Sequence, residues 1–211
     1  MQRQNRISKY LVLTLACIVA VILALALRAR ASAEEEIPKL AALMGWKPGT
    51  VVADIGAGDG SYAFAAVEQV GPSGKVYATE INQEKLKALR AEVKNRGLKN
   101  VTILESAEAE TNLPPFCCDA IYLRRVYHHL TKPLEFDASI LRSLKPGGKL
   151  AIIDFPPHPE YGKVEGVPKD RVNHGIYQKI LIHELGEAGF QVEKIVDDWP
   201  SDNYCVVFSK K

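Results

Sequence analysis

From residue 50 onward, short apolar runs rich in β-branched residues alternate with longer segments whose apolar positions recur at helical spacing. This alternation is typical of βαβ units and of a mostly parallel sheet. Gly-Pro and Pro-Gly turn signals at 71–74 and 145–148 each precede an apolar run. The pattern predicts strands over 50–55, 75–80, 101–105, 120–123 and 149–154, with helices over 35–44, 61–70, 83–96 and 134–144.

The pattern changes after residue 154. A loop rich in proline and histidine is followed by a predicted helix over 176–188 and by predicted strands over 192–197 and 204–208. Because only a short turn separates these two strands, we expect them to pair as an antiparallel hairpin.

The N-terminal part has a different pattern, with eighteen uncharged residues over 10–27. A helix of that length spans roughly 27 Å, just enough to cross a bilayer. The sequence therefore predicts that residues 1–33 form a membrane anchor and that a second, soluble domain covers 34–211. The small residues Ala31-Ser32-Ala33 leave open a signal segment and export after cleavage as the alternative.

The charge distribution argues against nucleic acid as a partner. The net charge is +2, yet five basic and no acidic residues lie in the first 30 positions, which leaves −3 for residues 31–211. A weakly acidic body lacks the positive surface that phosphate backbones require. The four cysteines show no C-x-x-C spacing, so we expect neither a zinc site nor a disulfide framework.

Candidate binding chemistry begins with the stretch ADIGAGDG, in which three glycines follow the first predicted strand. A loop at the carboxyl end of a parallel strand places backbone N–H groups against a ligand. A dinucleotide loop needs a third glycine one position later, where this chain has Ser61, so the spacing disfavours NAD. Glu80 ends the second strand, where a carboxylate can accept hydrogen bonds from a ribose diol.

Four motifs together resemble the class I S-adenosylmethionine-dependent methyltransferases: VVADIGAGDG (51–60), VYATEI (76–81), DAIYLRRVYHHL (119–130) and LKPGGKLAIIDF (144–155). The resemblance covers roughly residues 35–211 and is greatest to the small-molecule branch whose fourth strand runs into His-His-Leu. It implies an α/β fold, a Rossmann-like three-layer sandwich with a seven-stranded, mostly parallel sheet and an antiparallel C-terminal hairpin, preceded here by the hydrophobic N-terminal helix.

The resemblance also implies a set of contacts with the cofactor S-adenosyl-L-methionine. Glu80 is expected at the ribose and Ile81 beside the adenine. Family members commonly have an acidic residue just past the third strand, where this chain has Ser106 and Ala107, and Glu105 or Glu108 could substitute. The methionine part is expected to be surrounded by Asp54, Gly56, Gly58 and Gly60.

Candidate catalytic groups follow the fourth and fifth strands: Tyr127, His128 and His174. Histidine titrates near neutral pH and suits proton abstraction from an acceptor. His128 and His129 are each also compatible with a purely structural role. A metal site built from His128, His129, His158 and His174 is disfavoured, because no pair has the helical spacing of a preformed site.

Two adjacent arginines, Arg124 and Arg125, follow the fourth strand, where the resembling families have small or apolar residues. If either points into the site, an anionic acceptor becomes plausible. The alternative is an arginine that faces solvent or pairs with Glu110.

The sequence thus predicts a methyltransferase that acts on a small-molecule or lipid-soluble acceptor near a membrane. The favoured location is the cytoplasmic face, where the cofactor is made. A catalytically inactive cofactor-binding protein and, less favoured, an NAD-dependent oxidoreductase are the alternatives. The oligomeric state is not predicted.

Overall fold

The computed structural model describes the backbone of residues 2–169, 171 and 173–210, but not the side chains of 2–16, 19, 22, 23 and 26. In chain order the elements are α1 (Gln2–Met44), β1 (Val51–Ile55), α2 (Ser61–Val70), β2 (Lys75–Glu80), α3 (Gln83–Asn95), β3 (Val101–Glu105), β4 (Cys118–Arg124), α4 (Pro133–Ser143), β5 (Leu144–Asp154), α5 (Gln178–Glu187), β6 (Phe190–Trp199) and β7 (Asn203–Lys210). Single 3-10 turns cover Tyr127–His129 and Pro159–Tyr161.

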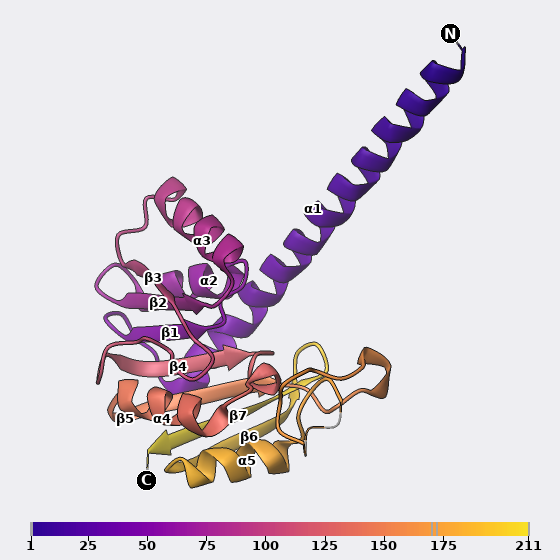
Figure 1. Ribbon diagram of the computed structural model, residues 1–211. Helices are drawn as coiled ribbons and strands as arrows, with labels where there is room; N and C mark the ends of the chain where they lie inside the picture. Colours follow the sequence, from indigo (N-terminus) through magenta and orange to yellow (C-terminus); the bar gives the residue numbers. More distant parts are fainter. Residues whose placement is uncertain (1, 170, 172, 211) are drawn as a thin grey trace.

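The seven strands form one sheet in the order β3-β2-β1-β4-β5-β7-β6 (Figure 1). Strands β1 to β5 are parallel, and β7 runs antiparallel to both β5 and β6. The expected Rossmann-like sheet with its C-terminal hairpin is confirmed. Strand order reverses between β1 and β4, and at such a switch point ligands bind beyond the carboxyl ends of the strands.

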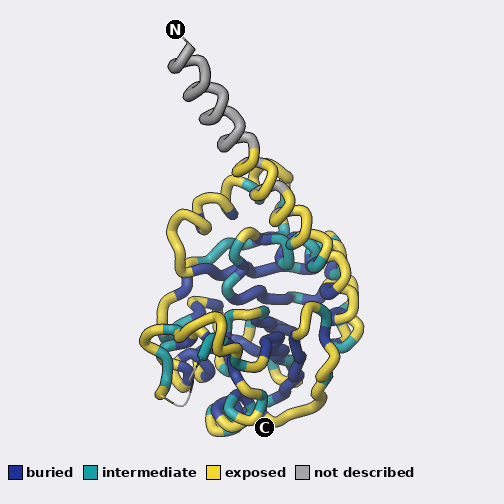
Figure 2. Tube along the Cα trace, turned by 90° about the vertical axis from the view of Figure 1, so that its right-hand side faces the viewer, coloured by how far each residue is buried: buried dark blue, intermediate teal, exposed yellow. Residues whose placement is uncertain are grey.

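Two hydrophobic clusters cover the two faces of the sheet. Alternate strand residues such as Val52 and Tyr122 pack with α1 and α2, and Ile55 and Leu123 pack with α4 and α5 on the other face. The strands lie in the buried interior and the outer faces of the helices are exposed (Figure 2). Both faces are therefore covered, as a parallel sheet requires.

Helix α1 continues through the expected domain boundary at residue 33 without a break. Its last turns bury Ala33, Ile37, Leu40, Ala41 and Met44 at helical spacing, and Ile37, Leu40 and Met44 pack against α2 and the sheet. The rest of α1 extends away from the sheet (Figure 1). The apolar stripe thus fixes only the C-terminal end of this helix to the domain.

The predicted membrane anchor is wrong: in the part of the chain that the structure describes, no helix is both long and apolar enough to cross a bilayer. Within the predicted segment 10–27, the side chains of residues 10–16, 19, 22, 23 and 26 lie outside that description.

Candidate functional site

The glycine loop, residues 56–60, connects β1 to α2 with its three glycines at positive φ, +73°, +58° and +84° in order. A Cβ atom on Gly56 would lie 2.5 Å from Val126, and one on Gly60 would lie 2.5 Å from the Phe64 ring. At Gly58 a Cβ would meet only a backbone oxygen, at 3.9 Å. Packing therefore explains the first and third glycines, whereas the middle one leaves open space over the loop.

Glu80 fixes this loop to the end of β2. Its side chain is buried and accepts hydrogen bonds from the backbone N–H groups of Gly58 at 3.0 Å, Ile81 at 2.9 Å and Asn82 at 3.0 Å. Ile81 itself is 53% exposed, unusual for a large apolar side chain. Ser106 donates its N–H to the Glu80 carbonyl at 3.0 Å, so the ends of β2 and β3 meet at this edge.

Asp54, the penultimate residue of β1, carries a buried carboxylate whose Oδ2 has no hydrogen-bond partner among the described residues. Burial, together with the nearby carboxylates of Asp59 and Glu80, raises its pKa to about 7. An unpaired buried carboxylate is costly and favours a cationic partner. The Asp54 carboxylate suits an ammonium group, and the Glu80 carboxylate suits hydroxyl groups. Together with the open space at Gly58, they fit a ligand that carries both.

A three-histidine cluster, His128, His129 and His174, lies beyond the ends of β4 and β5. The ring centroids are 4.1 Å apart for His128–His129, 4.7 Å for His128–His174 and 5.0 Å for His129–His174. The two loops that carry these residues are thus brought together, although no helical spacing in the sequence relates them. His158 bonds to His174 through the backbone but does not belong to the cluster.

Within this cluster His128 is held by a carboxylate. Its Nδ1 lies 2.7 Å from Asp154 Oδ1, and both side chains are almost fully buried. Asp154 also accepts the backbone N–H groups of His128 and Phe155. With Nδ1 as donor to this carboxylate, Nε2 carries the lone pair, and it has no hydrogen-bond partner among the described residues.

The neighbouring imidazoles are favoured in the neutral form. Burial, and then the proximity of His128 and His174, lowers the pKa of His129 to about 4. Burial likewise lowers the pKa of His174. Because protonation is disfavoured, these two rings are neutral at neutral pH and are weak proton acceptors.

Tyr127 is placed differently from the two histidines predicted with it. It is fully buried in the core, and its hydroxyl donates to Asp137 of α4 at 2.7 Å. Arg171 lies over its ring and donates to the carbonyls of Tyr127 and Leu130. Tyr127 therefore joins α4 and the loop after β5 to the turn that carries the histidines.

Arg124 and Arg125 both have partners within the chain. Arg124 makes a bidentate contact with Glu36 of α1, which also accepts hydrogen bonds from Tyr62 and Trp199. Arg125 donates to Asn203 and to the Ser201 carbonyl. The predicted partner Glu110 instead pairs with Arg142. Glu36 lies in a run of three glutamates, so no sequence signal distinguished it from its exposed neighbours.

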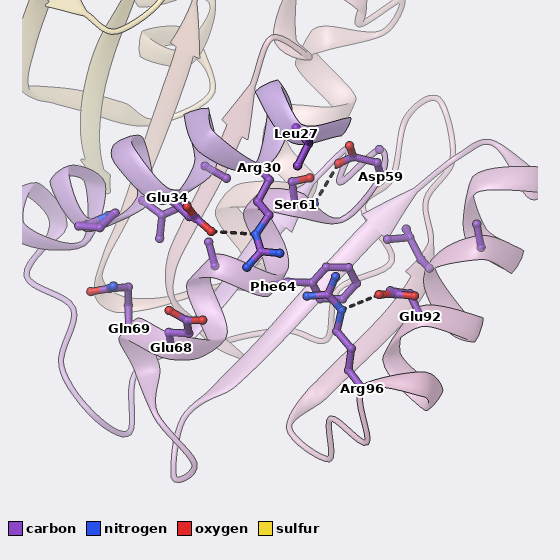
Figure 3. A pocket seen from close by; sticks show the side chains of 17 residues that line it. Leu27, Arg30, Glu34, Asp59, Ser61, Phe64, Glu68, Gln69, Glu92 and Arg96 are labelled. Carbon is purple, nitrogen blue, oxygen red and sulfur yellow. Dashed lines mark hydrogen bonds and ion pairs between the residues drawn. The ribbon is translucent and has the colours of Figure 1, made fainter. Parts of the chain in front are cut away.

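The glycine loop and the histidine cluster adjoin each other through Val126. This residue lies against Gly56 and comes two positions before His128. A hollow of about 670 Å³ lies between α1, α2 and α3, and its lining includes Gly58 and Asp59 of the loop (Figure 3). Two arginines of its lining, Arg30 and Arg96, are paired with Glu34 and Glu92.

Comparison with known proteins agrees with this geometry. Residues 46–189 match the family model described as a methyltransferase domain. The ubiquinone/menaquinone biosynthesis C-methyltransferase UbiE of Cupriavidus taiwanensis is 32% identical over 111 residues, which are 53% of this chain and 45% of that protein. The UbiE protein of Bordetella parapertussis is 34% identical over 109 residues, 52% of this chain and 42% of that one. The chain spans less than half the length of these curated relatives.

Among solved structures, an S-adenosylmethionine-dependent methyltransferase from Aquifex aeolicus superposes with a TM-score of 0.70 at 31% identity, covering 82% of this chain and 88% of that one. A second such methyltransferase, from Mesorhizobium loti, has a TM-score of 0.64 at 18% identity, with 81% and 95% covered, and supports the fold alone. The family match over residues 46–189 and the fold shared with these structures agree with the four sequence motifs. The chain belongs to the class I S-adenosylmethionine-dependent methyltransferases.

Proposed function

We propose that residues 34–211 form a methyltransferase domain that methylates a carbon atom of a small quinol-type acceptor. The observation that carries this proposal is the adjacency of two features: a glycine loop suited to the cofactor, and a buried histidine–carboxylate pair two residues past the contact of Val126 with that loop. The two relatives of about one-third identity whose names specify C-methylation in quinone biosynthesis support the acceptor class.

In this proposal, residues at the ends of β1, β2 and β3 would hold the cofactor. Asp54 binds the ammonium group of its methionine part, and Gly56, Gly58 and Gly60 give the backbone close access. Glu80 accepts hydrogen bonds from the ribose hydroxyls. The exposed side chain of Ile81 packs on the adenine, and Ser106 and Ala107 border it from β3.

The cofactor supplies an electrophilic methyl group on a sulfonium. His128 Nε2 accepts the proton of an acceptor hydroxyl, and the electron pair left on oxygen makes the adjacent ring carbon nucleophilic. The methyl group would pass from sulfur to that carbon, with sulfur keeping the electron pair, and the ring proton would then leave to water, which restores the ring. Asp154 orients His128, and His174 packs beside the acceptor. Tyr127 has a positioning role.

The test is a transfer assay with the purified full-length chain, labelled S-adenosylmethionine and a reduced naphthoquinol that lacks the ring methyl group. A second acceptor, already methylated at that carbon, is the matched control. We expect label on carbon in the first acceptor and none in the second. Label on oxygen alone, or cofactor binding without transfer to either acceptor, would overturn the proposed acceptor chemistry.

A further inference from the structure

We propose that His128, His129 and His174 together bind one divalent transition-metal ion of the Zn²⁺ type. One ring nitrogen from each of the three residues lies within 4.8 Å of the others. An ion equidistant from three nitrogens at that separation would lie roughly 2.8 Å from each. Zn–N bonds are about 2.0–2.1 Å long. Shifts of under about 1 Å per ring would therefore complete the site.

The second observation is the buried nitrogen of His128. Its Nδ1 is engaged with Asp154, and Nε2 is buried with no partner among the described residues. Histidines that bind metal ions usually donate their other ring N–H to a carboxylate, which fixes the tautomer and the ring orientation. Asp154 occupies this supporting position, and its remaining hydrogen bonds to backbone N–H groups hold it in place.

The chemistry of the ligand set identifies the class of ion. Three imidazoles with no carboxylate among the direct ligands suit Zn²⁺ and its neighbours rather than Mg²⁺ or Ca²⁺, which prefer oxygen. Three protein ligands also leave a position open, as in catalytic rather than structural zinc sites.

A consequence for the reaction follows, and it rests on the proposed function. An ion at this position would act as a Lewis acid on the acceptor oxygen and stabilise its deprotonated form. In the loaded protein the ion, rather than His128 alone, would then favour the nucleophilic form of the acceptor. The two loops after β4 and β5 would also be held together by the ion.

The test is a titration of the untagged full-length chain with Co²⁺, followed by its visible absorption, and with Zn²⁺ in competition. We expect one ion per chain, at least a 100-fold weaker affinity in His174→Ala, and a 10- to 100-fold weaker affinity in Asp154→Asn. His158→Ala is the matched control, because His158 contacts the same loop but lies outside the cluster. S-adenosylmethionine affinity reports that each variant is folded.

Absence of bound metal in the wild-type chain, or equal weakening by His158→Ala and His174→Ala, would overturn the inference. Methyl transfer is measured separately, once with the metal-loaded chain and once after a chelator has removed the ion. Metal binding without transfer to the quinol supports the ion site and contradicts the proposed acceptor. Transfer by a chain that binds no metal supports the acceptor and contradicts the ion site.

Discussion

The glycine loop and the histidine cluster occupy the same edge of the sheet but are built by different means. The loop depends on backbone conformation, with three positive φ angles and the Gly58 N–H, which bonds to Glu80 on the adjacent strand. The cluster depends on side chains from two separate loops, which Asp154 and Arg171 hold against each other. A local motif can therefore specify the first region, whereas the second requires the whole sheet to be assembled.

This difference predicts that the two regions can be damaged independently. Changes in the glycine loop should reduce cofactor binding or stability and leave the histidines in place. Changes around the histidines should reduce turnover and leave cofactor affinity unaltered.

The largest expected effect is on turnover in Asp154→Asn. Three donors converge on the two oxygens of Asp154, and asparagine retains only one accepting oxygen, so at least one donor loses its partner and His128 loses the carboxylate charge beside its ring. We expect kcat to fall by about 10²- to 10⁴-fold. Initial-rate kinetics measure the change.

The matched control is Asp198→Asn, because Asp198 is exposed on β6. It should leave kcat within twofold of the wild type. A comparable loss of S-adenosylmethionine affinity in Asp154→Asn would contradict the independence of the two regions.

The next effect is on stability in Gly60→Ala. Alanine at position 60 would have to adopt φ near +84°. Its Cβ atom would lie 2.5 Å from the Phe64 ring and 2.7 Å from Leu89. Left-handed strain and overpacking together should cost about 3 kcal/mol in the free energy of unfolding. Gly58→Ala has open space and should cost only about 1 to 2 kcal/mol. Urea denaturation compares them, and equal losses would show that packing does not require the third glycine.

A smaller effect is expected on cofactor affinity in Glu80→Gln. The amide nitrogen cannot accept hydrogen bonds, so one backbone N–H of the loop loses its partner and the charge is removed. Affinity for S-adenosylmethionine should weaken by about 1 to 3 kcal/mol. Calorimetry measures it, with Glu135→Gln at an exposed position of α4 as control. Equal weakening in both variants would point to a general charge effect.

The smallest effect concerns the pH dependence of stability, in which the two regions should differ in sign. The pKa of His129 is lowered to about 4, so its neutral form is favoured, and stability should fall as pH decreases from about 6.5 toward 4. The pKa of Asp54 is raised to about 7, so its carboxylate is disfavoured, and stability should fall as pH rises from about 4 toward 7. Urea midpoints across this range measure both effects.

The variants His129→Gln and Asp54→Asn show whether His129 and Asp54 cause these two changes of stability with pH. The first should remove part of the acid-side loss, and the second should remove part of the loss toward neutral pH. If either variant retains the full slope, another group in its region titrates instead.

Much of the fold could be predicted because periodicity and turn signals are local. The predicted strands 75–80 and 101–105 and the predicted helix 61–70 coincide with β2, β3 and α2. Strand β5 begins earlier than predicted, at Leu144, because Cys118 of β4 pairs with Leu144 beyond a bulge. The pairing partner, rather than the residues of the strand itself, sets that boundary.

Short motifs were enough to predict the sheet, the glycine loop and the place of Glu80 at the end of a strand, because each motif sets backbone conformation or ends a strand. Which polar side chains have partners depends instead on the tertiary structure. It directed Arg124 to Glu36 across 88 residues, turned Tyr127 into the core, and gathered three histidines that no sequence spacing had linked. The physical reason is that hydrogen bonds and side-chain clusters require groups to be close in space. Those short distances exist only once the strands are in their final order.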